Sequence, residues 1–191
     1  SLNHIENDHY ENSGMHDGKT PNISALLKET ATDDERRYQF LEEKIVNNAV
    51  LDFGCGGGYI LSSYENIDRF GVEINDAAIE VAKKNGAKIF KSSKDLPNNF
   101  FDVIISNHAL EHCDNPFLEL KELYRSLKDN GKICIVVPCD NIKYKYNEKD
   151  PHKHLYSWSP SNLGNILHTA GFKVLESKPS LFKWFPHRYR L

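Results

Sequence analysis

Short apolar runs alternate with amphipathic stretches through most of this 191-residue chain. Short, mostly apolar runs predict buried strands, and stretches in which apolar residues recur every three or four positions predict helices. The predicted strands are 49–54, 69–74, 87–91, 100–107, 131–138 and 172–178, and the predicted helices are 33–48, 76–86, 115–131 and 159–171. Strands that alternate with helices are typical of βαβ units. We therefore expect an α/β fold with a doubly wound, mostly parallel sheet and helices on both faces, seven-stranded if LFKWF at 181–185 adds a last strand.

The same pattern divides the chain into two parts. Residues 1–32 are polar and without period, and they are expected to form a flexible N-terminal arm, or alternatively a lid that orders over a bound ligand. From Asp33 the acidic residues of a first helical turn open an amphipathic helix. Residues 33–191 are expected to form a single domain, because their length and hydrophobic content suffice for one core.

Composition narrows the functional classes. The formal net charge of −3 argues against a general nucleic-acid or membrane-surface binder. Four scattered cysteines form no CxxC pair and indicate reduced thiols rather than a disulfide framework. No apolar run is long enough to span a bilayer, and no start resembles a signal peptide. A cytoplasmic location is the expectation.

The glycine-rich stretch VLDFGCGGG, residues 50–58, follows the first predicted strand. Glycines there allow a tight turn and a close approach of a ligand to the backbone. Glu73 lies 19 residues after Gly54, a spacing typical of an acid that binds ribose hydroxyls. The stretch fits D-x-G-x-G-x-G rather than the dinucleotide pattern, and the carboxylate of Asp52 favours a positively charged ligand over a pyrophosphate. S-adenosylmethionine has a ribose, a sulfonium and an ammonium group.

Four segments together resemble the successive motifs of the class I S-adenosylmethionine-dependent methyltransferases. They are VLDFGCGGG, FGVEIN, LPNNFFDVIISNHALEH and LKDNGKICIVVP, and the resemblance covers about residues 45–178. It implies a Rossmann-like fold and an enzyme that uses S-adenosylmethionine as its cofactor. The cofactor-binding residues that it implies are Asp52, Gly54, Cys55, Gly56, Glu73, Ile74, Ser92 and Asn107.

The resemblance also assigns roles within this set. The glycine turn would hold the methionine end, Glu73 the ribose diol, and Ile74 would flank the adenine. Where the family often has an acid that contacts the adenine amine, this chain has Ser92, whose hydroxyl can also hydrogen-bond the base. Asn107 and His108 would lie beneath the cofactor at the end of the fourth strand.

A second informative stretch is NHALEHC, residues 107–113. His108, Glu111 and His112 would share one face if this stretch were helical, and such a set can bind a divalent metal, with His152 or His154 as a further ligand. Two alternatives stay open. His108 could act alone as the general base that removes a hydroxyl proton, or the histidines could have purely structural roles.

A second resemblance to known methyltransferases supports the metal-binding alternative. Small-RNA 3′-terminal 2′-O-methyltransferases carry E-x-x-E-H here and a later His four residues before a Trp, which matches Glu111, His112, His154 and Trp158. The ubiquinone-pathway O-methyltransferases have a related E-x-x-E-H. In this chain His108 replaces the first acid, and the replacement favours zinc, manganese or iron over magnesium.

The sequence therefore predicts a methyltransferase that acts on an oxygen of a small polar metabolite or a sugar. A histidine-rich site suits an oxygen acceptor, and no NPPY-like tetrapeptide, typical of methylation at nitrogen, follows the fourth strand. The alternatives are a metal-dependent RNA ribose 2′-O-methyltransferase and a non-catalytic scaffold that binds the cofactor. The polar stretch 139–158, with interleaved aromatic and basic residues, is expected to carry acceptor specificity.

Overall fold

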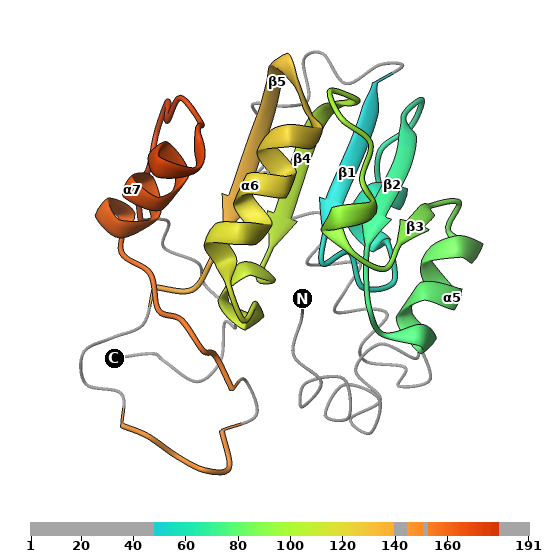
Figure 1. Cartoon of the computed structure of the whole chain (residues 1–191). Coiled ribbons are helices and arrows are strands. Elements are labelled where there is room, and N and C mark those ends of the chain that lie inside the picture. The colour runs from blue at the N-terminus through green and yellow to red at the C-terminus, as the bar shows by residue number, and fades with distance from the viewer. Residues whose placement is uncertain (1–47, 140–144, 151–152, 180–191) are drawn as a thin grey trace, which may run out of the picture.

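The computed structural model describes residues 48–139, 145–150 and 153–179 (Figure 1). Its strands are β1 (Ala49–Phe53), β2 (Asp68–Val72), β3 (Lys88–Phe90), β4 (Phe101–Asn107) and β5 (Leu127–Val136). Its α-helices are α4 (Tyr59–Ser62), α5 (Asp76–Lys84), α6 (Pro116–Ser126) and α7 (Pro160–Ala170), and two 3₁₀ turns are η1 (Ser93–Asp95) and η2 (Leu110–His112).

The five strands form one sheet in the order β3-β2-β1-β4-β5, and every adjacent pair is parallel. Alternate residues of the central strands enter different cores. Val50 and Val103 pack with α4 and α5 residues on one face, whereas Leu51 and Ile104 pack with α6 and α7 residues on the other. This alternation is the period-2 signature of a strand buried on both faces. The expected Rossmann-like, doubly wound sheet is confirmed.

The helices begin and end at residues that the sequence marks. Asn75 and Asn115 each accept a hydrogen bond from a first-turn N–H of α5 and α6. Ser159 and Asn162 form a capping box at the start of α7, and Gly171 ends that helix in the left-handed conformation. Figure 1 shows α6 and α7 at the β5 end of the sheet and α5 beside β3.

Two expectations about the sheet change. Residues 172–178 form no strand, and β5 is the sheet edge among the described residues. The stretch lies along α7 instead, where the Ser177 hydroxyl donates to the Pro160 carbonyl at 2.6 Å and Phe172 enters the core, so its amides meet no neighbouring strand. The part of the chain that the structure describes therefore has five strands, and the expected seven are not confirmed. The predicted arm 1–32, helix 33–48 and strand 181–185 lie outside the described residues.

Within the described ranges, no helix is long and apolar enough to cross a membrane.

Candidate functional site

The candidate site lies at the carboxyl ends of the central strands. After β1 the chain builds β2 and β3 on one side and then returns to build β4 on the other. The connections that leave β1 and β4 therefore run to opposite sides of the sheet, and this switch point is where open α/β sheets bind ligands. Two groups of residues meet here. We call Asp52, Gly54, Cys55, Gly56 and Glu73 the glycine-loop cluster, and His108, Glu111, His112 and His154 the histidine cluster.

The glycine turn is fixed to β2 and to the end of β4. The backbone N–H groups of Gly54 and Cys55 both donate to the Val72 carbonyl, at 2.9 and 3.1 Å. Gly54 has φ of +77°, and a Cβ on it would collide with the Cβ of Ala109. Both observations require glycine at this position. The close approach also places the glycine turn directly against the segment that carries His108.

Glu73 fastens the same turn from the end of β2. Its Oε2 accepts the Gly56 N–H at 2.8 Å, and its Oε1 accepts the N–H groups of Ile74 and Asn75 at 2.8 and 2.9 Å. A carboxylate offers about four acceptor positions. Three of the four are filled by these backbone donors, so Glu73 is held rigidly and its remaining acceptor position lies on Oε2, the oxygen that faces the turn.

The cluster is electrostatically negative. Burial raises the pKa of the Cys55 thiol well above its ordinary value, and the nearby charges of Asp52 and Glu73 raise it further. Asp52 is buried at the end of β1. Two carboxylates beside a thiol kept neutral give the turn a field that favours a cationic ligand.

The base-binding region expected from the sequence follows β3. Ser92 is half-buried, and its hydroxyl accepts the Lys94 N–H at 3.3 Å at the start of η1. The neighbouring Ser93 hydroxyl points elsewhere and donates to Oε2 of Glu119 at 2.5 Å. Ile74, which the sequence assigned to the adenine, is half-buried beside Glu73. Of the two serines, Ser92 is the more exposed.

His108 has an unusual backbone. It follows Asn107, the half-buried last residue of β4, and its φ of +53° lies in the left-handed region that costs a non-glycine residue about 1 kcal/mol or more. Its N–H donates to the Val136 carbonyl of β5 at 2.9 Å, which helps to hold this conformation. The side chain is 46% exposed, and Nδ1 lies 3.2 Å from Oε1 of Glu111, which is fully buried.

Glu111, His112 and His154 form the second part of the histidine cluster. One ligand atom from each lies within 4.8 Å of the others, and the rings of His112 and His154 meet edge to face with centroids 5.0 Å apart. Oε2 of Glu111 is buried without a hydrogen-bond partner among the described residues. The structure thus brings together three of the four predicted metal ligands. His108 lies outside this group because 110–112 is a single 3₁₀ turn, so the helical face expected for 108–112 does not form.

His154 reaches the site because its loop is tied to Glu111. The N–H groups of Leu155 and Tyr156 donate to the Glu111 carbonyl at 3.0 and 3.3 Å, and the Tyr156 hydroxyl donates to the Asp114 carbonyl at 3.0 Å. The sequence analysis did not identify Tyr156 as a residue that holds the site. No local signal marks it, because its partners lie more than 40 residues earlier in the chain.

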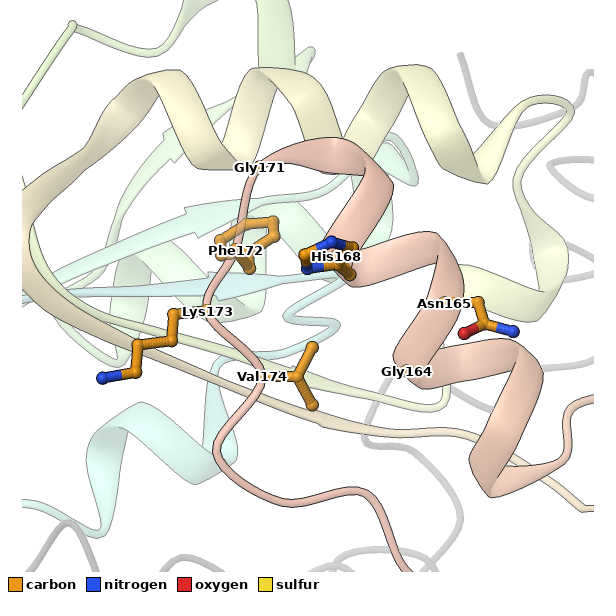
Figure 2. Close-up of a pocket in the computed structure, with 7 residues that line it drawn as sticks. All are labelled: Gly164, Asn165, His168, Gly171, Phe172, Lys173 and Val174. Atoms are coloured by element: carbon orange, nitrogen blue, oxygen red, sulfur yellow. The ribbon is translucent and has the colours of Figure 1, made fainter.

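A surface cavity of about 540 Å³ lies elsewhere, between α7 and the segment after it (Figure 2). Asn165 and His168 of α7 and Phe172 and Lys173 of that segment are among its lining residues. None of the residues of the glycine-loop or histidine clusters lines it, so it is separate from the site described above.

A glycine turn after β1 and an acid after β2, on a parallel sheet in this strand order, define the class I S-adenosylmethionine-dependent methyltransferases. The family model described as "Methyltransferase domain" matches residues 25–177. The chain belongs to this family, and it is a methyltransferase domain that uses S-adenosylmethionine.

The comparisons with individual proteins agree. The chain is 25% identical over 186 residues to a ubiquinone biosynthesis O-methyltransferase of Rickettsia canadensis, covering 81% of this chain and 78% of that protein. Its fold resembles that of a methyltransferase from Bacillus halodurans, with a TM-score of 0.64, 23% identity, and 75% and 71% of the two chains covered. It also resembles phosphoethanolamine N-methyltransferase 2 of Haemonchus contortus in complex with S-adenosylhomocysteine, with a TM-score of 0.62, 17% identity, and 75% and 37% covered.

Proposed function

We propose that this protein transfers a methyl group from S-adenosylmethionine to a hydroxyl oxygen of a small polar acceptor, with His108 as the general base. One observation carries the proposal: the half-exposed imidazole of His108 is held in a strained backbone conformation and oriented by the buried carboxylate of Glu111. Strain that the surrounding contacts maintain is a recurring feature of catalytic positions. The Cβ of Ala109, the next residue, lies against Gly54, and this contact supports a position of His108 next to the glycine turn.

The hydrogen bond to Glu111 sets the tautomer of His108. A carboxylate only accepts hydrogen bonds, so Nδ1 carries the proton and donates it at 3.2 Å. Nε2 is then left with its lone pair, ready to accept the proton of an acceptor hydroxyl. Glu111 stabilises the His108 imidazolium that forms, because its buried carboxylate then accepts a hydrogen bond from a positively charged donor.

The glycine-loop cluster would hold the cofactor. The remaining acceptor position of Glu73 suits a ribose hydroxyl, Ser92 suits the base, and the negative field of Asp52 suits the cationic methionine end. S-adenosylmethionine supplies a methyl group on a positively charged sulfur and leaves as S-adenosylhomocysteine. The remaining task of the protein is to align the acceptor oxygen and to remove its proton.

A second candidate is a metal-assisted form of the same transfer. Glu111, His112 and His154 present one carboxylate and two imidazoles within 4.8 Å of one another, and Oε2 of Glu111 is available. Such mixed oxygen and nitrogen donors suit zinc, manganese or iron. A metal there would lower the pKa of a bound acceptor hydroxyl, and both oxygens of a vicinal diol could then reach it.

The names of the relatives and the net charge bear on the nature of the acceptor. Relatives at about 25% identity are named as ubiquinone biosynthesis O-methyltransferases, which favours a small-molecule hydroxyl. A sugar hydroxyl fits the same chemistry. The RNA ribose alternative is disfavoured by the net charge of −3.

The test uses cofactor labelled with ¹³C on the methyl group, offered with catechols, sugars and short RNA ends. We expect a product whose methyl carbon resonance is that of a methoxy group, formed without added metal. Turnover that requires a divalent ion after chelation would move the proposal to the metal-assisted form. Methyl resonances of an N-methyl product would overturn it, and release of no S-adenosylhomocysteine with any acceptor would favour the non-catalytic scaffold.

A further inference from the structure

Helix α6 touches the chain segment next to the expected base-binding edge. The Glu73 N–H donates to the Phe90 carbonyl at 3.1 Å, so the end of β3 lies beside the end of β2. With the ribose at Glu73, a base attached to it would extend toward β3 and the segment that follows, Ser92–Leu96. The 3₁₀ turn η1 in that segment contacts α6.

The first of these contacts is a buried hydrogen bond. The Ser93 hydroxyl donates to Oε2 of Glu119 at 2.5 Å, and the two residues are 3% and 7% exposed. A carboxylate removed from water in this way requires hydrogen-bond donors to remain charged. The bond therefore fixes Ser93 toward α6, whereas the preceding Ser92 is only half-buried.

The second contact lies two turns further along the same helix. The guanidinium of Arg125 donates to the Leu96 carbonyl at 2.9 Å and reaches the carbonyls of Ser93 and Lys94 at 3.5 Å each. Glu122 aligns this guanidinium through contacts of 2.7 and 2.8 Å. A planar fork that reaches three carbonyls of one short segment holds that segment in a single position.

We propose that Glu119 and Arg125 are positioning residues for recognition of the cofactor base. They act through Ser93 and Leu96, which hold the segment so that the Ser92 hydroxyl stands where it reads the six-position of the purine. Base recognition in this chain thus depends on α6. The side chains of this helix act on the base indirectly, by holding the segment Ser92–Leu96. The proposal extends the cofactor site and does not depend on which acceptor is methylated.

The test compares two ligands by calorimetric titration. S-adenosylhomocysteine has a 6-amino purine, and its 6-deamino analogue has a hydrogen at C6, offers the Ser92 hydroxyl no hydrogen bond there and is otherwise the same. We expect the wild-type protein to prefer the amino form. Glu119→Ala and Arg125→Ala should each lower that preference about fivefold, the size expected for one misplaced hydrogen bond. Ser92→Ala should give a similar loss, since it removes the hydroxyl itself.

Matched variants separate positioning from a general loss of stability. Glu119→Gln keeps an oxygen that accepts from Ser93, and it should retain the preference within about twofold. Glu73→Gln should weaken both ligands equally and leave their ratio unchanged, because it acts at the ribose. Glu80→Gln, in an exposed ion pair on α5, should change neither quantity.

Two results would overturn the proposal. One is a folded Glu119→Ala or Arg125→Ala protein whose preference equals that of the wild type. The other is a Glu119→Ala or Arg125→Ala protein that loses affinity for both ligands by the same factor. If Glu119→Ala does not fold, Ser93→Ala removes the same hydrogen bond from the other side and must lower the preference. A wild-type protein that binds neither ligand would contradict the cofactor site itself, which is a different failure.

Discussion

The glycine-loop cluster and the histidine cluster are built in different ways. In the first, the Glu73 carboxylate is held by backbone N–H groups of Gly56, Ile74 and Asn75, at most 17 residues away in the chain. In the second, side chains contact side chains, and His154 arrives on a loop tied to the backbone of Glu111. Backbone donors are fixed by the fold, whereas side-chain pairs and loops can be exchanged without disturbing it.

This difference separates what the protein shares with its relatives from what is its own. A cofactor common to a whole family can be bound by the backbone of a conserved arrangement of strands. An acceptor that differs between enzymes requires residues on loops at the same edge. Changes in the first cluster should therefore affect cofactor binding and stability together, and changes in the second should affect turnover alone.

The largest effect is expected at Glu73. Glu73→Gln replaces one carboxylate oxygen, which accepts a backbone N–H, with an NH₂ group that cannot accept it. The change also removes the negative charge from the hydrogen bonds that remain. Each hydrogen bond to a charged group contributes about 1.5–3 kcal/mol, so affinity for S-adenosylhomocysteine should fall about 100-fold or more. The unliganded protein should also melt at a lower temperature. Calorimetry and thermal melting measure both quantities.

Asp76→Asn is the matched control for Glu73. It lies three residues later and forms an exposed ion pair with Lys91, so it should change affinity very little. If Glu73→Gln bound S-adenosylhomocysteine within threefold of the wild type, the backbone-held carboxylate would not be the ribose site.

The next effect is expected at His108. His108→Ala removes the general base, and kcat should fall about 10²- to 10⁴-fold while the affinity for S-adenosylhomocysteine stays within twofold. His108→Gly removes the same group and also relieves the positive φ, so it should be at least as stable as His108→Ala. His168→Ala on α7 is the control. A fully active His108→Ala protein would exclude both the base and any role of this dyad.

A smaller effect is expected at His154. His154 lies on the loop that also carries Tyr156, and its ring meets that of His112 edge to face. His154→Ala removes this ring contact. We expect kcat/KM for the acceptor to fall about tenfold, while cofactor affinity stays unchanged. A chelator should affect the activity of the variant no more than that of the wild type. Two results together would favour the metal-assisted form over His108 acting as the base alone. A chelator would abolish the activity of the wild type, and both His154→Ala and His112→Ala would lose metal binding.

The two clusters also differ in how far the sequence could predict them. The apolar runs at 49–54 and 100–107 became β1 and β4, because a strand buried on both faces needs apolar residues throughout. The positions of Gly54 and Glu73 followed from the same strands, since the ends of parallel neighbours share one edge. Residues 172–178 have the composition of a strand but no neighbour to pair with in the described structure, and composition alone does not supply a partner.

The histidine cluster was predictable in its members but not in its geometry. The spacing of His108, Glu111 and His112 suggested one helical face, but His108 has a positive φ and the residues after it form a 3₁₀ turn. His108 therefore contacts Glu111 but lies outside the group that Glu111 forms with His112 and His154. The position of His154 depends on hydrogen bonds from a loop more than 40 residues later to the Glu111 carbonyl. Neither a strained backbone angle nor a long-range loop contact leaves a local pattern in the sequence.

The smallest effect compares Cys55 of the glycine-loop cluster with Cys134 on β5, which lies outside both clusters. Burial raises the pKa of Cys55, with Asp52 and Glu73 adding to the shift, and burial raises the pKa of Cys134 on β5 from 9.0 to about 12. The thiolate is the reactive form, so at pH 8 both should be alkylated far more slowly than the exposed Cys139, and their rates should rise with pH.

Cofactor binding should then separate the two thiols. S-adenosylhomocysteine stabilises the folded glycine turn by mass action. At a concentration of about four times its Kd, it should slow the alkylation of Cys55 about fivefold and leave that of Cys134 unchanged. Mass spectrometry of the labelled peptides measures each rate separately. Equal protection of both cysteines would mean that the ligand tightens the whole sheet, and the glycine-loop cluster would then not be the independent, backbone-held unit that its hydrogen bonds describe.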